Sequence, residues 1–193
     1  MSGTAAKRWT LQEFLDWEER QEHRHEFVDG DIRMMTGGTK GHAGIARNIL
    51  FALYGRLRGS PCLPYGSDLR VTIPTVGNVR YPDVTVDCGH QDPDAQEAAK
   101  PVVVFEVLSK STAWYDQTRK LRDYEACPDI LHYVCVSQSE VRVSVWLRDA
   151  HGRLVPQEDI TDLSATLDLP AIGVDLALAD IYEGVAPISE PQA

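Results

Sequence analysis

Cysteine, long apolar runs and positive charge are all scarce in this chain of 193 residues. The four cysteines, Cys62, Cys88, Cys127 and Cys135, show no C-x-x-C spacing, which argues against a zinc ribbon or a thioredoxin-like redox motif. Three of them lie in or beside apolar runs. We therefore expect all four cysteines to be reduced thiols in the core.

No segment reaches the roughly 18 uninterrupted apolar residues of a membrane span. Residues Met1 to Thr10 also lack the apolar region of a signal peptide. We therefore expect a cytoplasmic protein with no membrane partner. With 193 residues, 43% of them hydrophobic, the chain can bury one core. We expect one domain over residues 1–187 and a loose C-terminal tail over 188–193.

The net charge of -10 argues against a nucleic-acid partner, because phosphate binding is mostly a cationic effect. Its distribution weakens that objection, since residues 149–193 hold nine acids and one base. The rest of the chain is nearly balanced, and its bases either form a local basic face or are scattered and solvated. The candidates for such a face are Arg47, Arg56, Arg58, Arg70, Arg80, Lys110, Arg119, Lys120 and Arg122.

Apolar periodicity and turn residues predict alternating helices and strands. We expect helices over Leu11 to about Arg20, about His42 to Leu57, and from a Ser111 or Thr112 cap to about Glu125. We expect a hairpin around Asp29-Gly30, a turn at Gly77-Asn78, and strands over 68–73, 83–87, 102–108, 130–136 and 141–147, before an apolar segment at 176–182. This order predicts an α/β or α+β domain with a mixed sheet flanked by helices.

Two carboxylates stand out within the apolar strands. Asp83 follows Tyr81-Pro82 at the head of one expected strand, and Glu106 lies inside the apolar run Val102 to Leu108. Burying a charge is costly unless something compensates it. Carboxylate oxygens suit Mg²⁺ or Mn²⁺, so a bound divalent cation is the compensation we expect.

A lysine completes the set that metal-assisted phosphodiester hydrolysis requires. Strand alternation places Val104, Glu106 and Leu108 on one face, so Leu108 stands where a strand-borne lysine would be expected. Lys120 lies on the following helix, with Asp116 one turn before it and Tyr124 one turn after it. Its long side chain can reach back over the end of the strand.

These residues together resemble the Uma-two family of restriction endonucleases, within the PD-(D/E)xK nuclease superfamily. The resemblance covers nearly the whole chain. It rests on Tyr81-Pro82-Asp83, on Phe105 to Ser109, on Ser111-Thr112 with Asp116, Lys120 and Tyr124, on Glu26 to Gly30, on His42, and on the apolar segment near Leu169 to Tyr182.

The resemblance implies a restriction-endonuclease-like core in which Asp83 and Glu106 bind Mg²⁺ or Mn²⁺. It also implies that Lys120 replaces the lysine missing at Leu108, and that the Val107 carbonyl and Glu26 add to the metal shell. Lys110 stands where the family commonly has proline. The candidate phosphate or site contacts are His42, Lys110 and Tyr124, and the implied partners are DNA and a second copy of the chain.

Three functions remain open at this point: a metal-dependent deoxyribonuclease, a catalytically silent DNA-binding or regulatory module, and a structural homo-oligomer with buried ion pairs. Each site residue also has an ordinary structural interpretation. Asp83 could cap a turn, Glu106 could pair with an arginine, Lys120 could form an exposed helical pair with Asp116, Glu26 could be solvated, and His42 could cap its helix.

Overall fold

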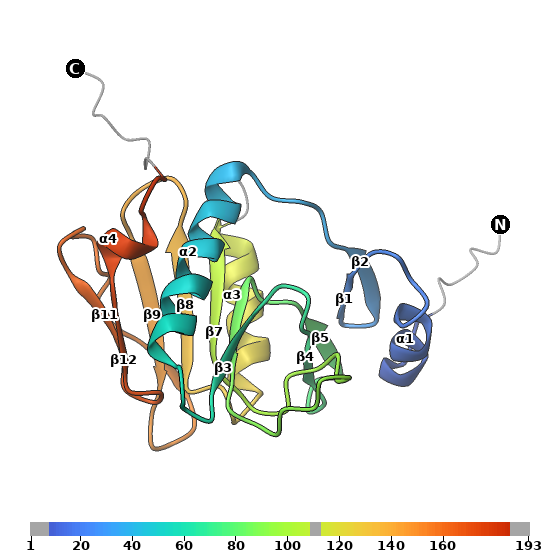
Figure 1. Ribbon diagram of the computed structural model, residues 1–193. Coiled ribbons are helices and arrows are strands. Elements are labelled where there is room, and N and C mark those ends of the chain that lie inside the picture. The colour runs from blue at the N-terminus through green and yellow to red at the C-terminus, as the bar shows by residue number, and fades with distance from the viewer. Residues whose placement is uncertain (1–7, 109–112, 186–193) are drawn as a thin grey trace.

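The computed structural model describes residues 8–108 and 113–185 (Figure 1). Its helices are α1 (Leu11–Glu18), α2 (Lys40–Arg56), α3 (Ala113–Glu125) and α4 (Leu178–Ile181). Its strands are β1 (His25–Val28), β2 (Asp31–Met34), β3 (Leu63–Gly66), β4 (Val71–Ile73), β5 (Asn78–Arg80), β6 (Val84–Asp87), β7 (Pro101–Leu108), β8 (His132–Ser137), β9 (Val143–Arg148), β10 (Leu154–Pro156), β11 (Thr166–Leu169) and β12 (Val174–Ala177). Lys110, the Ser111 or Thr112 cap and the 188–193 tail lie outside the described residues.

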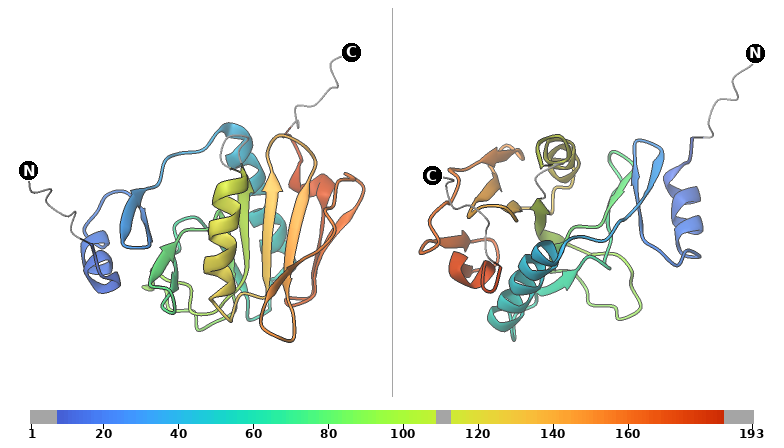
Figure 2. Two further views of the ribbon diagram at one scale, coloured as in Figure 1. Left: turned by 180° about the vertical axis from the view of Figure 1, so that it is seen from behind. Right: turned by 90° about the horizontal axis from the view of Figure 1, so that it is seen from above.

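The central sheet has six strands in the order β10-β9-β8-β7-β6-β3. Strands β7 and β8 are parallel and are joined by α3, whereas the other neighbours in this sheet are antiparallel. Helix α2 covers one face of the sheet and α3 covers the other (Figures 1 and 2). The expected fold class, a mixed sheet flanked by helices, is therefore confirmed.

Strand β7 is buried on both faces because its two sets of side chains enter two different cores. Val103, Phe105 and Val107 pack in the core that includes α2 residues such as Ile45 and Ile49. The alternate residues face α3, where Val104 and Leu108 belong to the second core with Tyr124. Glu106 lies between Val104 and Leu108 in this alternation, so its carboxylate points to the α3 side.

A smaller sheet, in the order β2-β1-β5-β4, brings the N-terminal hairpin toward the central sheet. The hairpin turns at Asp29-Gly30, and both residues have positive φ, 55° and 87°. Strand β1 pairs with β5 through the single register pair Phe27↔Val79, and a third core around Phe14 and Phe27 covers the junction. This pairing brings Glu26, on β1, toward the central sheet.

Several elements differ from the expected bounds. Helix α1 ends at Glu18, the strand expected over 68–73 shortens to Val71–Ile73, and Asn78 begins β5 instead of ending a turn. Strand β3 was not expected, because its four residues include Pro64. Its place at the edge of the sheet explains why a proline is tolerated there.

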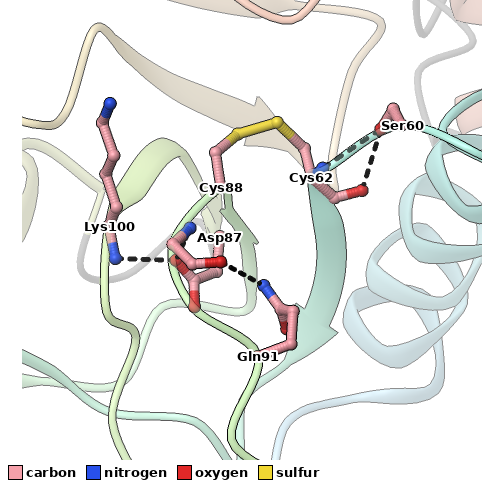
Figure 3. Close-up of a disulfide and its surroundings, with 7 residues drawn as sticks. Ser60, Cys62, Asp87, Cys88, Gln91 and Lys100 are labelled. Carbon is pink, nitrogen blue, oxygen red and sulfur yellow. Dashed lines mark hydrogen bonds between the residues drawn. A yellow bond between two sulfur atoms is a disulfide. The ribbon is translucent and has the colours of Figure 1, made fainter.

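The expectation of four reduced thiols is wrong for one pair, because Cys62 and Cys88 form a disulfide (Figure 3). In the antiparallel pairing of β3 with β6, Leu63 lies opposite Asp87. The residue before Leu63 and the residue after Asp87 are therefore neighbours. Cys127 and Cys135 are free and buried, as expected.

Within the described residues, no helix is both long and apolar enough to cross a membrane.

Candidate active site

The expected site residues gather around a cleft of about 620 Å³. The cleft lies where β7 ends and β6 begins, beside the N-terminus of α2, the β1-β2 hairpin and α3. Six of these residues line it: Glu26, His42, Asp83, Glu106, Val107 and Lys120. Residues that are far apart in the sequence are thus brought to one end of the central sheet.

Asp83 is held against the end of β7 by a backbone hydrogen bond. The Val107 amide donates to Asp83 Oδ2 over 2.7 Å, and His42 Nε2 lies 3.2 Å from the same oxygen. The pairing of Val84 with Phe105 in neighbouring strands sets this position. Asp83 therefore contacts the backbone of the strand that carries Glu106, as well as the first turn of α2.

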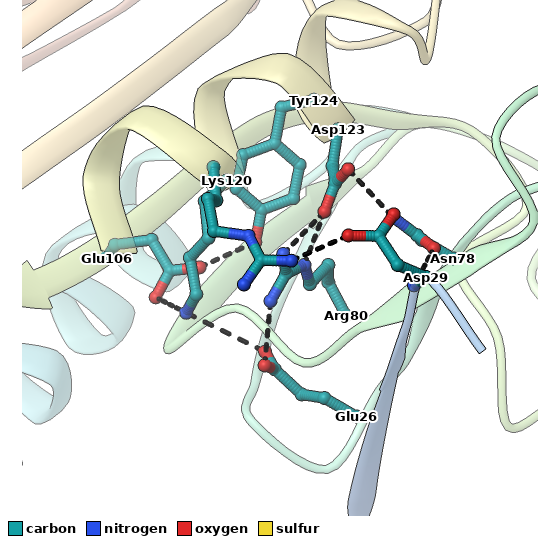
Figure 4. Close-up of polar contacts among 9 residues, drawn as sticks. Glu26, Asp29, Asn78, Arg80, Glu106, Lys120, Asp123 and Tyr124 are labelled. Atoms are coloured by element: carbon teal, nitrogen blue, oxygen red, sulfur yellow. Dashed lines mark hydrogen bonds and ion pairs between the residues drawn. The ribbon is translucent and has the colours of Figure 1, made fainter. Parts of the chain in front are cut away.

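Glu106 is almost entirely buried, with 6% of its side chain exposed. Lys120 Nζ donates to Glu106 Oε2 over 2.7 Å, and the Tyr124 hydroxyl donates to Oε1 over 2.5 Å (Figure 4). Burial raises the pKa of Glu106 to about 7; Lys120 opposes this shift, and the charge of Asp83 adds to it. The ionised form of Glu106 therefore needs positive charge nearby to be stable.

Lys120 lies between two carboxylates, with Nζ 2.7 Å from Glu106 and 3.7 Å from Glu26. Burial alone lowers the pKa of Lys120, but the attraction of Glu106 and then Glu26 outweighs it, so the pKa is raised. The lysine is thus held in its charged form. Its side chain is 19% exposed and points into the cleft, which differs from an ordinary exposed helical pair.

A buried arginine joins the hairpin to α3 in a network that sequence reasoning missed (Figure 4). Arg80 places one nitrogen 2.9 Å from Glu26 and another 2.5 Å from Asp123, while the Asn78 amide donates to Asp123 over 2.8 Å. Only 4% of the Arg80 side chain is exposed. A basic residue directly before Tyr81-Pro82-Asp83 was the sequence signal that could have found it.

His42 occupies the first turn of α2 and is not the cap of that helix. Thr39 is the cap, and its hydroxyl accepts a hydrogen bond from the His42 amide. A Cβ at Gly38 would lie 2.8 Å from His42 Nδ1, so glycine at this position leaves room for the ring. The hydrogen bond to Asp83 raises the pKa of His42 despite its partial burial.

Those bases considered for a basic face that the structure describes do not form one surface. Arg70 and Arg80 are buried and paired with carboxylates, and Arg119 pairs with Asp29. Arg47 and Arg58 lie exposed on and just after α2. These basic side chains are therefore divided between structural ion pairs and exposed positions on more than one element, including Arg122 on α3.

The donor set of the cleft fits a hard divalent cation. Its candidate donors are the carboxylates of Asp83 and Glu106 and the carbonyl of Val107, all oxygen ligands of the kind that Mg²⁺ prefers. The charge of Asp83 raises the pKa of Glu106, and a cation between the two would relieve that repulsion. Among the described residues, no group of three or more His, Cys, Asp or Glu residues is arranged to hold a metal. Water molecules would therefore complete the coordination, as is usual for Mg²⁺.

The chain belongs to a family of restriction-endonuclease type. Residues 11–179 match the family model described as "Uma2: Putative restriction endonuclease". This match spans the hairpin, the strands that carry Asp83 and Glu106, and the helix that carries Lys120.

Two proteins of Synechocystis sp. are similar to this chain. The uncharacterized protein slr1290 is 36% identical over 177 residues, which cover 91% of this chain and 92% of that protein. The uncharacterized protein sll1609 is 28% identical over 137 residues, covering 69% of this chain and 77% of that protein.

A solved structure shares the fold. It is described as a "putative nuclease belonging to DUF820" from Anabaena variabilis, and it superposes with a TM-score of 0.72 at 17% sequence identity. The match covers 90% of this chain and 97% of that chain. At this level of identity the likeness establishes the fold alone.

Proposed function

We propose that this protein is a metal-dependent endonuclease that hydrolyses phosphodiester bonds in DNA. The observation that carries the proposal is the convergence of Asp83, Glu106 and Lys120 on one cleft, in a chain of the restriction-endonuclease family. A purely structural set of ion pairs has no need of such an opening.

Each residue has a role that follows from its contacts. Asp83 and Glu106, with the Val107 carbonyl and Glu26 as further candidates, would hold Mg²⁺ or Mn²⁺. When bound, the cation would supply charge neutralisation and a more acidic water. Lys120 would orient the attacking water or face the charge that develops on the phosphate.

The remaining site candidates are His42, Tyr124 and Lys110. Tyr124 fixes the Glu106 carboxylate through its hydroxyl, and His42 contacts the Asp83 carboxylate through Nε2. Both side chains therefore hold the carboxylates in place. Lys110 lies outside the described residues, and its role as a phosphate contact stays a prediction.

A catalytically silent DNA-binding module of the same fold is the second candidate. The observation that favours it is the pairing of Lys120 with Glu106, because a lysine engaged by a buried carboxylate can serve stability alone. Cleavage distinguishes the two candidates, since both bind DNA.

The decisive experiment incubates the protein with supercoiled, linear and single-stranded DNA in Mg²⁺, Mn²⁺ or EDTA. We expect cleavage that needs the metal and is lost in Asp83→Asn. Asp175→Asn is the matched control, because Asp175 is exposed on β12 and does not line the cleft. Metal-independent cleavage would contradict the proposed chemistry, and a complete lack of cleavage by wild type would favour the silent module.

Thermal melts give an independent readout of metal binding. A cation that binds only the folded state raises the melting temperature. We expect Mn²⁺ to stabilise the wild type and the Asp175→Asn control but not Asp83→Asn. An equal shift in all three proteins would place the cation elsewhere.

We also propose that the protein acts as a homodimer. Cutting both strands of a duplex takes two sites, and pairing enlarges the contact area of a small domain. The N-terminal hairpin and the acidic C-terminal region are the candidate dimer interfaces. Light scattering at micromolar concentration tests this, and a monomer would contradict it.

A further inference from the structure

Helix α2 carries an unusual charge for this acidic chain. Between Lys40 and Arg58 there are four bases, Lys40, Arg47, Arg56 and Arg58, and no acid, although the whole chain has a net charge of -10. The inner side of the helix is apolar and buried in the main core. The positive charge is therefore confined to the outer and lateral sides of α2.

Two large aromatic side chains lie between the basic side chains on the outer face of α2. Phe51 is 81% exposed and Tyr54 is 58% exposed. Arg47, Phe51 and Tyr54 have i, i+4, i+7 spacing and line one face of α2, and Arg58 lies just beyond the end of the helix. We call Arg47, Phe51, Tyr54 and Arg58 the α2 stripe. In Figure 1, α2 lies in front of the sheet, and none of the described elements crosses its outer face.

The two arginines of the stripe are available to a negatively charged partner. Arg47 hydrogen-bonds to the neutral amide oxygen of Asn48. Among the described residues, neither Arg47 nor Arg58 has a carboxylate within ion-pair distance. By contrast, Arg56 on the side of the helix pairs with Asp180. The stripe therefore offers cationic groups that no carboxylate within the described part of the chain neutralises.

The helix is held in place beside a groove. The Asn48 amide donates to the carbonyls of Ile181 and Glu183, which ties α2 to the α4 region. The groove between them has a volume of about 540 Å³, with Arg47 and Phe51 on one wall and Asp180 and Glu183 on the other. The acids would repel phosphate from their wall, so phosphates are expected on the side of Arg47 and Arg58.

The stripe also leads to the candidate active site. Thr39 and His42, at the start of the same helix, line the cleft. At a rise of ~1.5 Å per residue, Tyr54 lies roughly 18 Å from His42 along the axis of α2, which is room for several nucleotides. Because His42 lies ~140° around the helix from Arg47, a DNA strand that follows the stripe would cross the first turn of α2 to enter the cleft.

We propose that the α2 stripe binds the unpaired strand of DNA and guides it to the cleft, an inference that rests on the proposed nuclease function. Exposed aromatic rings stack on bases, and neighbouring arginines contact the phosphates. In a duplex the base faces are already stacked on one another, so Phe51 and Tyr54 would find no partner. The preferred substrate class is therefore DNA that contains a single-stranded segment.

Binding is measured by fluorescence anisotropy with a labelled oligothymidine and a labelled duplex, using the full chain in EDTA so that no metal-dependent cleavage occurs. We expect the oligothymidine to bind more tightly than the duplex. Phe51→Ala with Tyr54→Ala should weaken oligothymidine binding roughly ten-fold or more. Leu163→Ala is the apolar control, since Leu163 is exposed but lies outside the stripe.

The phosphate contacts of Arg47 and Arg58 are tested by the salt dependence of DNA affinity. Arg47→Gln with Arg58→Gln should reduce the slope of log affinity against log salt by about 1.4, because each lost phosphate contact on a single strand removes ~0.7. Arg153→Gln is the matched control at another exposed arginine. An unchanged slope in the double variant would overturn the phosphate role.

Two further outcomes would overturn the proposal. One is oligothymidine binding that the aromatic double variant leaves unchanged. The other is a change of oligomeric state in that variant with DNA binding intact, which would make the stripe a contact between two copies. Cleavage by wild type distinguishes the two proposals. If wild type cleaves DNA and the stripe variants bind DNA as tightly as wild type, only the DNA-guiding role of the stripe is removed. Weakened binding in the stripe variants of a protein that does not cleave removes only the nuclease chemistry.

Discussion

Lys120 Nζ lies 2.7 Å from Glu106 Oε2, although the two residues are 14 positions apart and belong to α3 and β7. The lysine approaches from the crossover helix, whereas the strand itself carries the apolar Leu108 on that face. Its position depends on the packing of α3 against β7, where the Tyr124 hydroxyl holds the other oxygen of Glu106.

Lys120→Ala should remove cleavage while leaving metal binding in place. The proposed role of the lysine lies in the transition state, so we expect kcat to fall by about 100-fold or more. Steady-state cleavage of a labelled substrate in Mn²⁺ provides the measurement, and the Mn²⁺-induced shift in melting temperature reports metal binding. A Lys120→Ala protein with full activity would take this residue out of the mechanism.

Arg80→Gln should destabilise the fold strongly. The change leaves Glu26 and Asp123 without their buried cation, and breaking such a pair costs about 3–5 kcal/mol. Urea unfolding gives the free energy. Arg142→Gln is the matched control, because Arg142 pairs with Glu140 and Asp159 at the surface and its loss should cost at most ~1 kcal/mol. Equal losses in both variants would show that the Arg80 network does not tie the hairpin to α3.

Reduction of the Cys62–Cys88 disulfide should lower stability. The bridge closes a segment of 26 residues. In the chain-entropy model, opening a loop of this size removes about 3.5 kcal/mol. Unfolding with and without a reducing agent measures the loss, and a Cys62→Ser, Cys88→Ser variant should no longer respond. A count of four free thiols in the untreated protein would contradict the bridge.

His132 should make the fold sensitive to mild acid. Burial lowers the pKa of His132 to about 4, and neither ring nitrogen has a hydrogen-bond partner among the described residues. The folded state therefore resists protonation that the unfolded state accepts near pH 6.5. The stability contributed by neutral His132 is present above that pH and is lost as the pH falls toward 4.

His132→Phe should flatten the stability curve over this interval, measured by urea unfolding at a series of pH values. With one pKa unit equal to about 1.4 kcal/mol, the difference between variant and wild type should change by up to ~3 kcal/mol between pH 7 and pH 4. His151→Phe, at an exposed turn, is the control and should leave the curve unchanged. Parallel stability curves for wild type and His132→Phe would rule out His132 as the source of the acid sensitivity.

Periodicity was enough to predict the elements that carry the site. The alternation of β7 correctly placed Glu106 on the face of Val104 and Leu108, and the helices expected over His42 to Leu57 and up to Glu125 are present as α2 and α3. These signals are local, because each depends on a few turns of helix or one strand. The positions of Asp83, Glu106 and Lys120 followed from them once the strands were taken as neighbours.

Long-range pairing could not be predicted in the same way. Arg80 contacts Glu26 and Asp123, which lie 54 and 43 positions away, and nothing in the local sequence identifies either partner. The disulfide was missed for a related reason. The short edge strand β3 contains a proline, so the pairing that brings Cys62 beside Cys88 had no sequence signal.

The hairpin and the central sheet are separate sheets, and the carboxyl groups around Lys120 are divided between them. Glu106 lies on the central sheet, whereas Glu26 lies on β1, which meets β5 through a single register pair. The charge that faces Lys120 therefore depends on how the two sheets are joined, because each sheet supplies one of the two acids.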